Sequence, residues 1–328
     1  MLSRRRFNQF ALASASAAAL SPVLAQNASP ITLWGPPVAP TALLSLAAQD
    51  EALQEVYPGI SAKTWATPDQ LRAGLANGEM PLVMVPSYVA ANFRNQGRDV
   101  GLLNIMTFGL LYVIGKDDSV NSLEDLIGKT LVMPFKQDMP DLVLQTLLAK
   151  AGIDQDQVTI QYTSTPPEAL MLFLSGKADV ALLPEPAVSM AQIKAKGLGM
   201  DVQRRLNIQE LWGSYMETKA RIPQAGLMVT REFYETQQPF LQALHQPLQR
   251  ALNLCDENPQ LAAERTADIL KAPVPVMAAS IPQANLTITH ASEISEEILE
   301  FFDVLYQLNP KILGGKAADS DLIWSMPA

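Results

Sequence analysis

The stretch TLVMPFKQDMPDLVLQTLLAK, residues 130–150, contains the structural unit from which the fold of this chain can be inferred. Residues 130–133 form a short apolar run that is typical of a buried β-strand. Residues 142–150 repeat apolar side chains at helical spacing, and Asp138 stands where a helix cap would stand, so we expect a helix over 138–151. The stretch therefore predicts a strand, a polar loop and a helix, which is the repeating unit of α/β proteins.

The same unit recurs on both sides of this stretch. Further strands are expected at residues 31–34, 60–65, 81–85, 158–162, 178–183 and 222–229. Helices are expected at residues 41–53, 122–127, 166–174 and 186–196, and also after Thr67 and after Tyr88. The chain beyond residue 229 is expected to contain helices without a further strand, at residues 239–254, 259–270 and 294–306. Strands that alternate with helices predict an α/β fold with mostly parallel sheets flanked by helices.

Two apolar segments divide the chain into two lobes. Residues 101–115, GLLNIMTFGLLYVIG, carry no charge and predict a buried strand or strand pair. With residues 222–229 they suggest that the chain passes twice between two α/β halves, near 108–115 and 223–229. We expect one lobe from residues 31–110 and 225–328, and an inserted lobe from residues 113–220. Two crossings between lobes form a hinge, and the lobes then enclose a cleft that opens and closes.

The first 25 residues have the composition of an export signal. Arginines at positions 4–6 precede a short apolar run at 10–20, and Val23-Leu-Ala25 is a small-residue cleavage signal. The arginines after Ser3 are typical of the twin-arginine route, which exports folded proteins. We expect a mature protein that begins near Gln26 and is free in the periplasm.

The charge and the scarce reactive side chains exclude several functions. The net charge is −9, and loss of the leader lowers the basic count from 24 to 21 against 33 acidic residues. This balance argues against nucleic acid and against anionic membranes as partners. The single Cys255 and the two histidines, His245 and His290, leave little scope for a metal site or a catalytic triad. We expect no catalytic residue, no metal and no cofactor.

Ligands of open α/β sheets bind beyond the carboxyl ends of the strands. The loops at those positions carry aromatic rings, hydroxyls, amides and helix-start N–H groups, a mixture that suits a small solute held without chemistry. The candidate ligand-binding residues are Trp34, Gly35, Pro36, Val38, Ser87, Tyr88, Phe135, Lys136, Gln137, Asp138, Glu185 and Trp212.

Three strings carry a resemblance to a known family: NSLEDLIGKT at 121–130, ALMLFLSGKADV at 169–180 and LLPEP at 182–186. They resemble the periplasmic solute-binding proteins of ABC importers, in the branch for nitrate, taurine and other sulfonates, over nearly all of the chain after the leader. The resemblance implies the type II periplasmic binding protein fold. It also implies a monomer that captures a small organic solute in the interlobe cleft and delivers it to an importer permease.

The acidic loop before the helix at 138–151 indicates the chemistry of the solute. Sulfonate or nitrate binders usually have small or hydroxyl residues at this helix start, whereas this chain has KQDMPD at 136–141. Asp141 fits a structural role in the first turn, and Asp138 fits either a cap or a ligand contact. Lys136 fits a partner of Asp138, a ligand contact or a solvated side chain, and Glu185 before Pro186 fits a helix cap or a ligand contact. An amine-bearing, zwitterionic or neutral heterocyclic solute fits this loop better than nitrate, and a hard-cation site is the alternative.

Two other functions are compatible with this fold. A sensory protein would present its ligand to a membrane receptor rather than to an importer. An enzyme resembling the pyrimidine-precursor synthases of thiamine biosynthesis would need a site rich in cysteine and histidine, for which this chain offers few residues.

Overall fold

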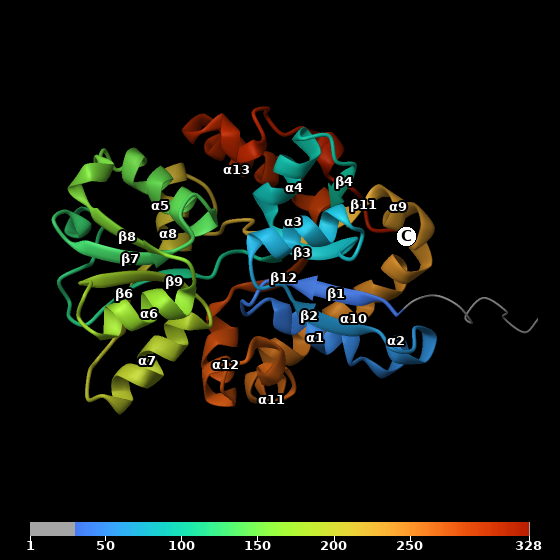
Figure 1. Ribbon diagram of the computed structural model, residues 1–328, viewed down its shortest axis with the longest axis horizontal. Coiled ribbons are helices and arrows are strands. Elements are labelled where there is room, and N and C mark those ends of the chain that lie inside the picture. The colour runs from blue at the N-terminus through green and yellow to red at the C-terminus, as the bar shows by residue number, and fades with distance from the viewer. Residues whose placement is uncertain (1–29, 328) are drawn as a thin grey trace, which may run out of the picture.

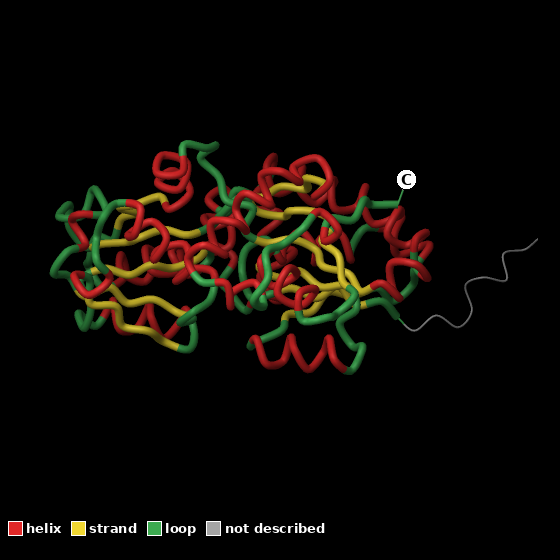
Figure 2. The backbone as a smooth tube through the Cα atoms, turned by 90° about the horizontal axis from the view of Figure 1, so that it is seen from above, coloured by secondary structure: helices red, strands yellow, loops and turns green. Residues whose placement is uncertain are grey.

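The computed structural model describes residues 30–327, which form two β-sheets flanked by helices (Figure 1). We call the part built around the seven-stranded sheet lobe 1 and the part built around the five-stranded sheet lobe 2. Figure 2 shows the two sheets one beyond the other along the long axis of the molecule. The expected leader, residues 1–25, lies outside the described residues. In the described part of the chain, no helix combines the length and the apolar character that crossing a membrane requires.

Lobe 1 contains a mixed sheet with the strand order β12-β5-β11-β3-β1-β2, and β4 pairs with β11 beside it. Its strands are β1 Thr32–Gly35, β2 Ser61–Thr64, β3 Leu82–Pro86, β4 Val100–Leu102, β5 Asn104–Thr107, β11 Ala225–Thr230 and β12 Leu286–His290. Strand β11 lies against β5 without space for a side chain, because a Cβ on Gly226 would lie 1.8 Å from the carbonyl oxygen of Asn104. A glycine is therefore required at this position.

Lobe 2 contains a mixed sheet with the strand order β10-β6-β9-β7-β8. Its strands are β6 Leu111–Gly115, β7 Thr130–Pro134, β8 Thr159–Thr163, β9 Val180–Pro184 and β10 Gln203–Asn207. The strand expected at residues 130–133 is β7, which leads into a helix and pairs in parallel with both β8 and β9.

Several helices begin at a residue whose side chain caps the first turn. Thr165 precedes Pro166 and accepts a hydrogen bond from the backbone N–H of Glu168, and Thr67 precedes Pro68 and accepts one from the backbone N–H of Gln70. The helices are α1 Thr41–Ala48, α2 Glu51–Val56, α3 Pro68–Ala76, α4 Ser87–Asn95, α5 Met139–Lys150, α6 Pro166–Leu174, α7 Ala187–Gly197, α8 Ile208–Met216, α9 Arg231–Thr236, α10 Gln238–Glu257, α11 Pro259–Leu270, α12 Val274–Ser280 and α13 Ser295–Leu308.

The prediction of an α/β fold with helix-flanked sheets is confirmed, but the sheets are mixed rather than mostly parallel. Strand β11 runs antiparallel to β3, β4 and β5, and β6 runs antiparallel to β9 and β10. Both strands adjoin a crossing between the lobes, so each enters its sheet from the opposite end to the strands of the βα units. The expectation of helices alone after residue 229 is also wrong, since β12 pairs with β5. The helix expected at 122–127 is only a 3₁₀ turn, Glu124–Leu126.

Two chain segments cross between the lobes side by side. The first joins β5 to β6 and contains Phe108 and Leu110, and the second leads from α8 into β11. The backbone N–H of Ile222 donates to the carbonyl oxygen of Phe108 at 2.9 Å, and the Leu110 N–H donates to Oε1 of Gln224 at 3.2 Å. The crossings therefore form one hydrogen-bonded connection.

Helix α13 makes a third contact between the lobes, although it follows lobe 1 in sequence. It packs on α5 of lobe 2, and the ring of Phe301 meets the ring of Trp212 in α8 edge-on at 5.3 Å. In Figure 1 it is the red helix drawn above and between the two sheets. One hydrophobic cluster accordingly contains side chains from both lobes.

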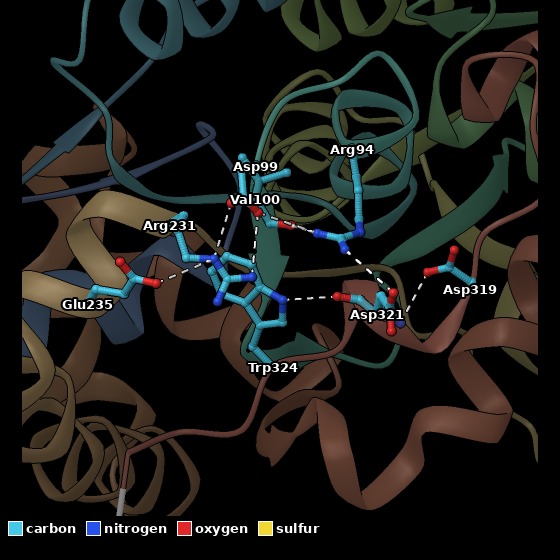
Figure 3. Close-up of polar contacts among 8 residues, drawn as sticks. All are labelled: Arg94, Asp99, Val100, Arg231, Glu235, Asp319, Asp321 and Trp324. Atoms are coloured by element: carbon cyan, nitrogen blue, oxygen red, sulfur yellow. Dashed lines mark hydrogen bonds and ion pairs between the residues drawn. The ribbon is translucent and has the colours of Figure 1, made fainter.

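The C-terminal segment is bound to lobe 1 around Trp324 (Figure 3). The Trp324 ring is 7% exposed, its Nε1 donates to the carbonyl oxygen of Asp321 at 2.9 Å, and the Arg231 guanidinium lies 3.8 Å from its centre. Asp99 accepts hydrogen bonds from Arg231 and also lies within ion-pair distance of Arg94. These contacts tie the C-terminal segment to the end of lobe 1 that is drawn away from lobe 2 in Figure 1.

Candidate functional site

Tyr88 and Asp138 meet across the boundary between the lobes. Tyr88 lies in the first turn of α4 in lobe 1, and Asp138 caps α5 in lobe 2. The Tyr88 hydroxyl donates a hydrogen bond to Oδ1 of Asp138 at 2.6 Å. Burial and the neighbouring Asp138 charge raise the pKa of Tyr88 well above its ordinary value, so the phenol remains a neutral donor.

The loop that carries Asp138 has an unusual backbone. Phe135 and Gln137 adopt left-handed conformations, with φ of 65° and 59°. Each such non-glycine residue costs about 1–3 kcal/mol, and this kind of strain gathers at functional sites. The conformation turns the chain so that the backbone N–H of Asp138 donates to the carbonyl oxygen of Phe135 at 3.1 Å.

Asp141 holds this loop from within lobe 2. Its carboxylate accepts hydrogen bonds from the Gln137 N–H at 2.7 Å, the Tyr162 hydroxyl at 2.8 Å and the Gln145 side-chain amide at 2.8 Å, and the residue is fully buried. Burial and the bond to Asp141 raise the pKa of Tyr162 to about 12. Asp141 thus has the structural role that its place in the first helical turn suggests.

A cavity of about 520 Å³ opens beside the Tyr88–Asp138 pair, and we call it the interlobe cavity. Lobe 1 contributes side chains from the residues before α3, from α3 itself, from α4 and from the 3₁₀ turn Pro310–Leu313. Lobe 2 contributes the loop at 136–138. The residues of its lining that matter most here are Trp65, Asp69, Arg72, Tyr88, Asn92, Phe93, Lys136, Gln137, Asp138 and Lys311.

A second hollow of about 920 Å³ adjoins the interlobe cavity on the lobe 2 side. Lys136 and Asp138 border both spaces, so the 136–138 loop stands between them. The hollow is bordered further by Tyr162, Thr163 and Glu168. The Lys136 ammonium lies 5.3 Å from the centre of the Tyr162 ring, which is a cation–π distance.

The cavity holds charges of both signs. Asp69 and Arg72 form an exposed ion pair at 2.9 Å on α3. Among the described residues, Lys136, Lys311 and Asp138 belong to no ion pair within 4.0 Å. Trp65 is fixed in the wall, because its Nε1 donates to the carbonyl oxygen of Met84 at 3.2 Å. The arrangement offers aromatic faces, an acceptor and two cations to one bound molecule.

The structure brings five of the predicted ligand-binding residues to these spaces: Tyr88, Phe135, Lys136, Gln137 and Asp138. Ser87 adjoins Tyr88 but is fully buried, and its hydroxyl donates to the carbonyl oxygen of Pro223 at 2.5 Å. It therefore joins α4 to a crossing segment and does not border the cavity.

The loop after β1 lies at another part of the lobe boundary. A Cβ on Gly35 would lie 2.5 Å from the Thr41 hydroxyl oxygen, and that hydroxyl donates to the carbonyl oxygen of Pro36 at 2.5 Å. Val38 packs in a small apolar cluster with Leu110. These three predicted residues are therefore packed together near the crossings and away from the interlobe cavity.

Glu185 is fully buried inside lobe 2. It forms an ion pair with Arg204 of β10 and accepts a hydrogen bond from the Ser189 N–H at 3.2 Å. Burial raises the pKa of Glu185 even though Arg204 acts in the opposite direction. Its carboxylate thus binds the first turn of α7 and a side chain of β10. Its backbone oxygen accepts a hydrogen bond from the Ala39 N–H of lobe 1 at 3.3 Å.

Two predicted tryptophans are largely buried away from the interlobe cavity, and Trp212 borders a separate hollow of about 600 Å³ beside α13. Trp34 is 6% exposed in the core of lobe 1, and its Nε1 has no hydrogen-bond partner among the described residues. Trp212 is 3% exposed and packs on Phe301 of α13. Neither borders the interlobe cavity, so ligand contact by either ring stays a prediction.

Several cavity residues did not emerge from the sequence. Trp65 follows β2 and could have been found by the same carboxyl-end rule that selected Trp34. Arg72 lies inside a helix, and Lys311 lies far along the chain after α13, so no local pattern pointed to them. Among residues 30–327, no group of three or more His, Cys, Asp or Glu side chains is arranged to hold a metal ion.

Comparisons with known proteins agree with this architecture. Residues 100–262 match the family model described as NMT1/THI5 like, and no curated protein matches the whole sequence significantly. Among solved structures, an ABC transporter from Parabacteroides distasonis matches with a TM-score of 0.72 and 20% identity, over 90% of this chain and 99% of that one. The periplasmic aliphatic sulphonate-binding protein SsuA of Escherichia coli matches with a TM-score of 0.70 and 18% identity, over 92% and 94%.

The alkanesulfonate-binding protein SsuA of Xanthomonas axonopodis pv. citri, bound to MOPS, gives a TM-score of 0.68 and 17% identity over 92% of this chain and 100% of that one. Identities this low establish a shared fold, whereas a ligand depends on the side chains of the site. Residues 100–262 are thus similar to the NMT1/THI5-like family model, and the chain shares the two-sheet α/β fold of these solved binding-protein structures.

Proposed function

We propose that this protein captures a small organic solute between its lobes and delivers it to the permease of an ABC importer. The observation that carries the proposal is a cavity whose walls come from both lobes and whose two sides meet at the Tyr88–Asp138 hydrogen bond. A solute in that cavity touches both lobes at once, so its binding favours the closed arrangement over an open one. The structural neighbours, which include an ABC transporter and two sulfonate-binding proteins, support the same function.

We further propose that residues 31–110 with 225–328 and residues 113–220 move as two bodies. The hydrogen-bonded crossings at Phe108–Leu110 and Ile222–Gln224 would act as the hinge. Small-angle scattering with and without a verified ligand measures the change in radius that closure produces.

Export to the periplasm by the twin-arginine route belongs to the same proposal. The arginines at positions 4–6 and the apolar run after them support it. The shared fold with a periplasmic sulphonate-binding protein supports the periplasmic location.

A binding role fits this chain better than an enzymatic one. The described residues that line the interlobe cavity include neither cysteine nor histidine. Cys255 is 1% exposed within lobe 1, and burial raises the pKa of its thiol to about 12, so it is not a nucleophile near neutral pH. His245 and His290 stack on each other, with ring centres 4.6 Å apart.

The test is native mass spectrometry of protein purified from its own periplasm, followed by a thermal-shift screen of anions, amines, amino acids and heterocycles. A ligand at about 100 times its Kd stabilises the folded state by about 2.7 kcal/mol, so a true ligand raises Tm in a concentration-dependent way. A protein that purifies without any bound small molecule and responds to no compound would contradict the proposed function.

A further inference from the structure

The start of α5 offers no backbone donor to an anion over four successive positions. The N–H of Gln137 donates to Asp141, that of Asp138 donates to Phe135, and that of Met139 donates to Oδ1 of Asp138 at 2.7 Å. Pro140 has no N–H. Helix starts commonly bind oxyanions through such groups, but here two carboxylates and one backbone carbonyl of the protein itself already accept from them.

Asp138 borders the interlobe cavity and keeps one acceptor without a partner among the described residues. Its Oδ1 accepts from Tyr88 and from Met139, while its Oδ2 accepts no hydrogen bond from the described residues. The side chain is half-buried and borders both the interlobe cavity and the hollow beside it. A carboxylate in this position repels an oxyanion and attracts a protonated nitrogen.

The cations and rings around the cavity complete a site for a molecule with separated charges. Lys136 and Lys311 border the cavity and have no ion-pair partner among residues 30–327. Tyr88 and Phe93 present aromatic surface to the same space, which suits an alkylammonium or a flat cation. An anionic group at the other end of the solute could then meet the lysines.

We propose that the site selects a small organic cation or zwitterion whose protonated amine binds Asp138, and that it rejects oxyanions lacking an amine. This inference rests on the proposed function, because it names the class of solute that the cavity takes. It sets the chain apart from the sulfonate-binding proteins whose fold it shares.

Calorimetric titration with paired probes tests the selection. γ-Aminobutyrate and putrescine supply amines, butyrate and propanesulfonate supply anions without one, and the molecule found by native mass spectrometry is titrated beside its amine-free analogue. We expect binding only among amine-bearing probes, and weaker binding at high salt. An amine-free oxyanion that binds as tightly as its amine-bearing partner overturns the inference and leaves the proposed function intact. If no molecule co-purifies and no probe binds, the proposed function fails and the inference fails with it.

The substitution Asp138→Asn removes the charge but retains a good helix cap. With an amine-bearing ligand, affinity should fall by about 10- to 100-fold, in line with the loss of a charge-assisted hydrogen bond, while Tm without ligand stays nearly constant. Asp154→Asn is the matched control, because Asp154 also stands at a helix start of lobe 2 but is exposed and outside the cavity. Equal affinities of the wild type and Asp138→Asn would remove Asp138 from the site and overturn the inference.

Discussion

Arg221 and Glu297 form a two-pronged ion pair between a crossing segment and α13. Nε of Arg221 donates to Oε1 at 2.6 Å and Nη2 donates to Oε2 at 2.5 Å. The same guanidinium lies 4.1 Å from the centre of the Phe108 ring, which belongs to the other crossing. One side chain therefore contacts both crossings and the helix that packs on lobe 2.

We expect Arg221→Gln to lower the free energy of unfolding by about 1–2 kcal/mol, because it removes two charge-assisted hydrogen bonds and leaves Glu297 with only the exposed Lys219, whose Nζ lies 3.8 Å from Oε2. Urea unfolding of Arg221→Gln, Glu297→Gln and the double variant gives the coupling energy of the pair. Faster hydrogen exchange at residues 108–110 and 222–224 should accompany the loss.

The control for this cycle is the Asp69–Arg72 pair, whose side chains are 93% and 66% exposed. An exposed pair of this spacing contributes about 0.3–0.5 kcal/mol. A coupling energy for Arg221–Glu297 no larger than that of the surface pair would contradict the expected contribution of this ion pair to stability.

Asp141→Asn should destabilise the protein by about 2–3 kcal/mol. The buried carboxylate serves three donors, and a neutral amide cannot accept from all of them. Tyr162→Phe removes only one of these donors and should cost about 1 kcal/mol. Thermal unfolding of both variants measures the difference. Wild-type stability in Asp141→Asn would mean that the acid does not hold the loop at 135–138.

The stacked histidines predict a loss of stability in mild acid. Burial first, and the neighbouring His290 second, lower the pKa of His245 below its ordinary value of 6.5. The unfolded chain therefore binds more protons than the folded one as pH falls through 6.5, so the stabilising difference is present above that pH and is lost below it.

The measurement is Tm of the wild type and His245→Gln between pH 7.5 and pH 5. The variant lacks the titrating ring, so the gap between the two proteins should narrow on acidification. Parallel curves over this range would show that His245 titrates alike in both states.

Trp324→Ala should destabilise lobe 1 by about 3 kcal/mol or more, because a large buried ring is replaced by a cavity. The ring packs so closely on β4 that a Cβ on Gly101 would lie 2.0 Å from its Cδ2. Tyr234→Phe is the milder control, since it removes only the hydrogen bond from the hydroxyl to the carbonyl oxygen of Ser325. Ligand affinity should not change when it is measured at a temperature where the variant is fully folded, because Trp324 does not border the interlobe cavity. A Tm equal to that of the wild type would mean that the C-terminal segment adds no stability.

Arg4→Lys combined with Arg5→Lys should block export and leave folded protein in the cytosol, because the twin-arginine route requires the arginine pair. Cell fractionation with a melting curve of the retained protein tests both parts. Normal periplasmic amounts of the double variant would show that another route exports the protein.

Local patterns determined most elements of this fold. A strand needs only a short apolar run, and a helix start needs a Thr or Asn cap before a proline, so β7, α6 and α11 could be predicted within one or two residues. The structural role of Asp141 could be inferred in the same way, because an acid in the first helical turn meets donors that lie close in sequence.

The tertiary structure decided everything that depends on partners far apart along the chain. The strand directions and the pairing of β12 with β5 depend on how the chain returns between the lobes. The spacing of apolar residues within one segment contains no information about that return. The burial of Glu185 depends on Arg204 from another strand, and the interlobe cavity depends on α3, α4 and Lys311 meeting the 136–138 loop. Tyr88 and Asp138 are 50 residues apart and meet only because the two lobes pack against each other, so their contact reflects packing between lobes rather than the conformation of either segment.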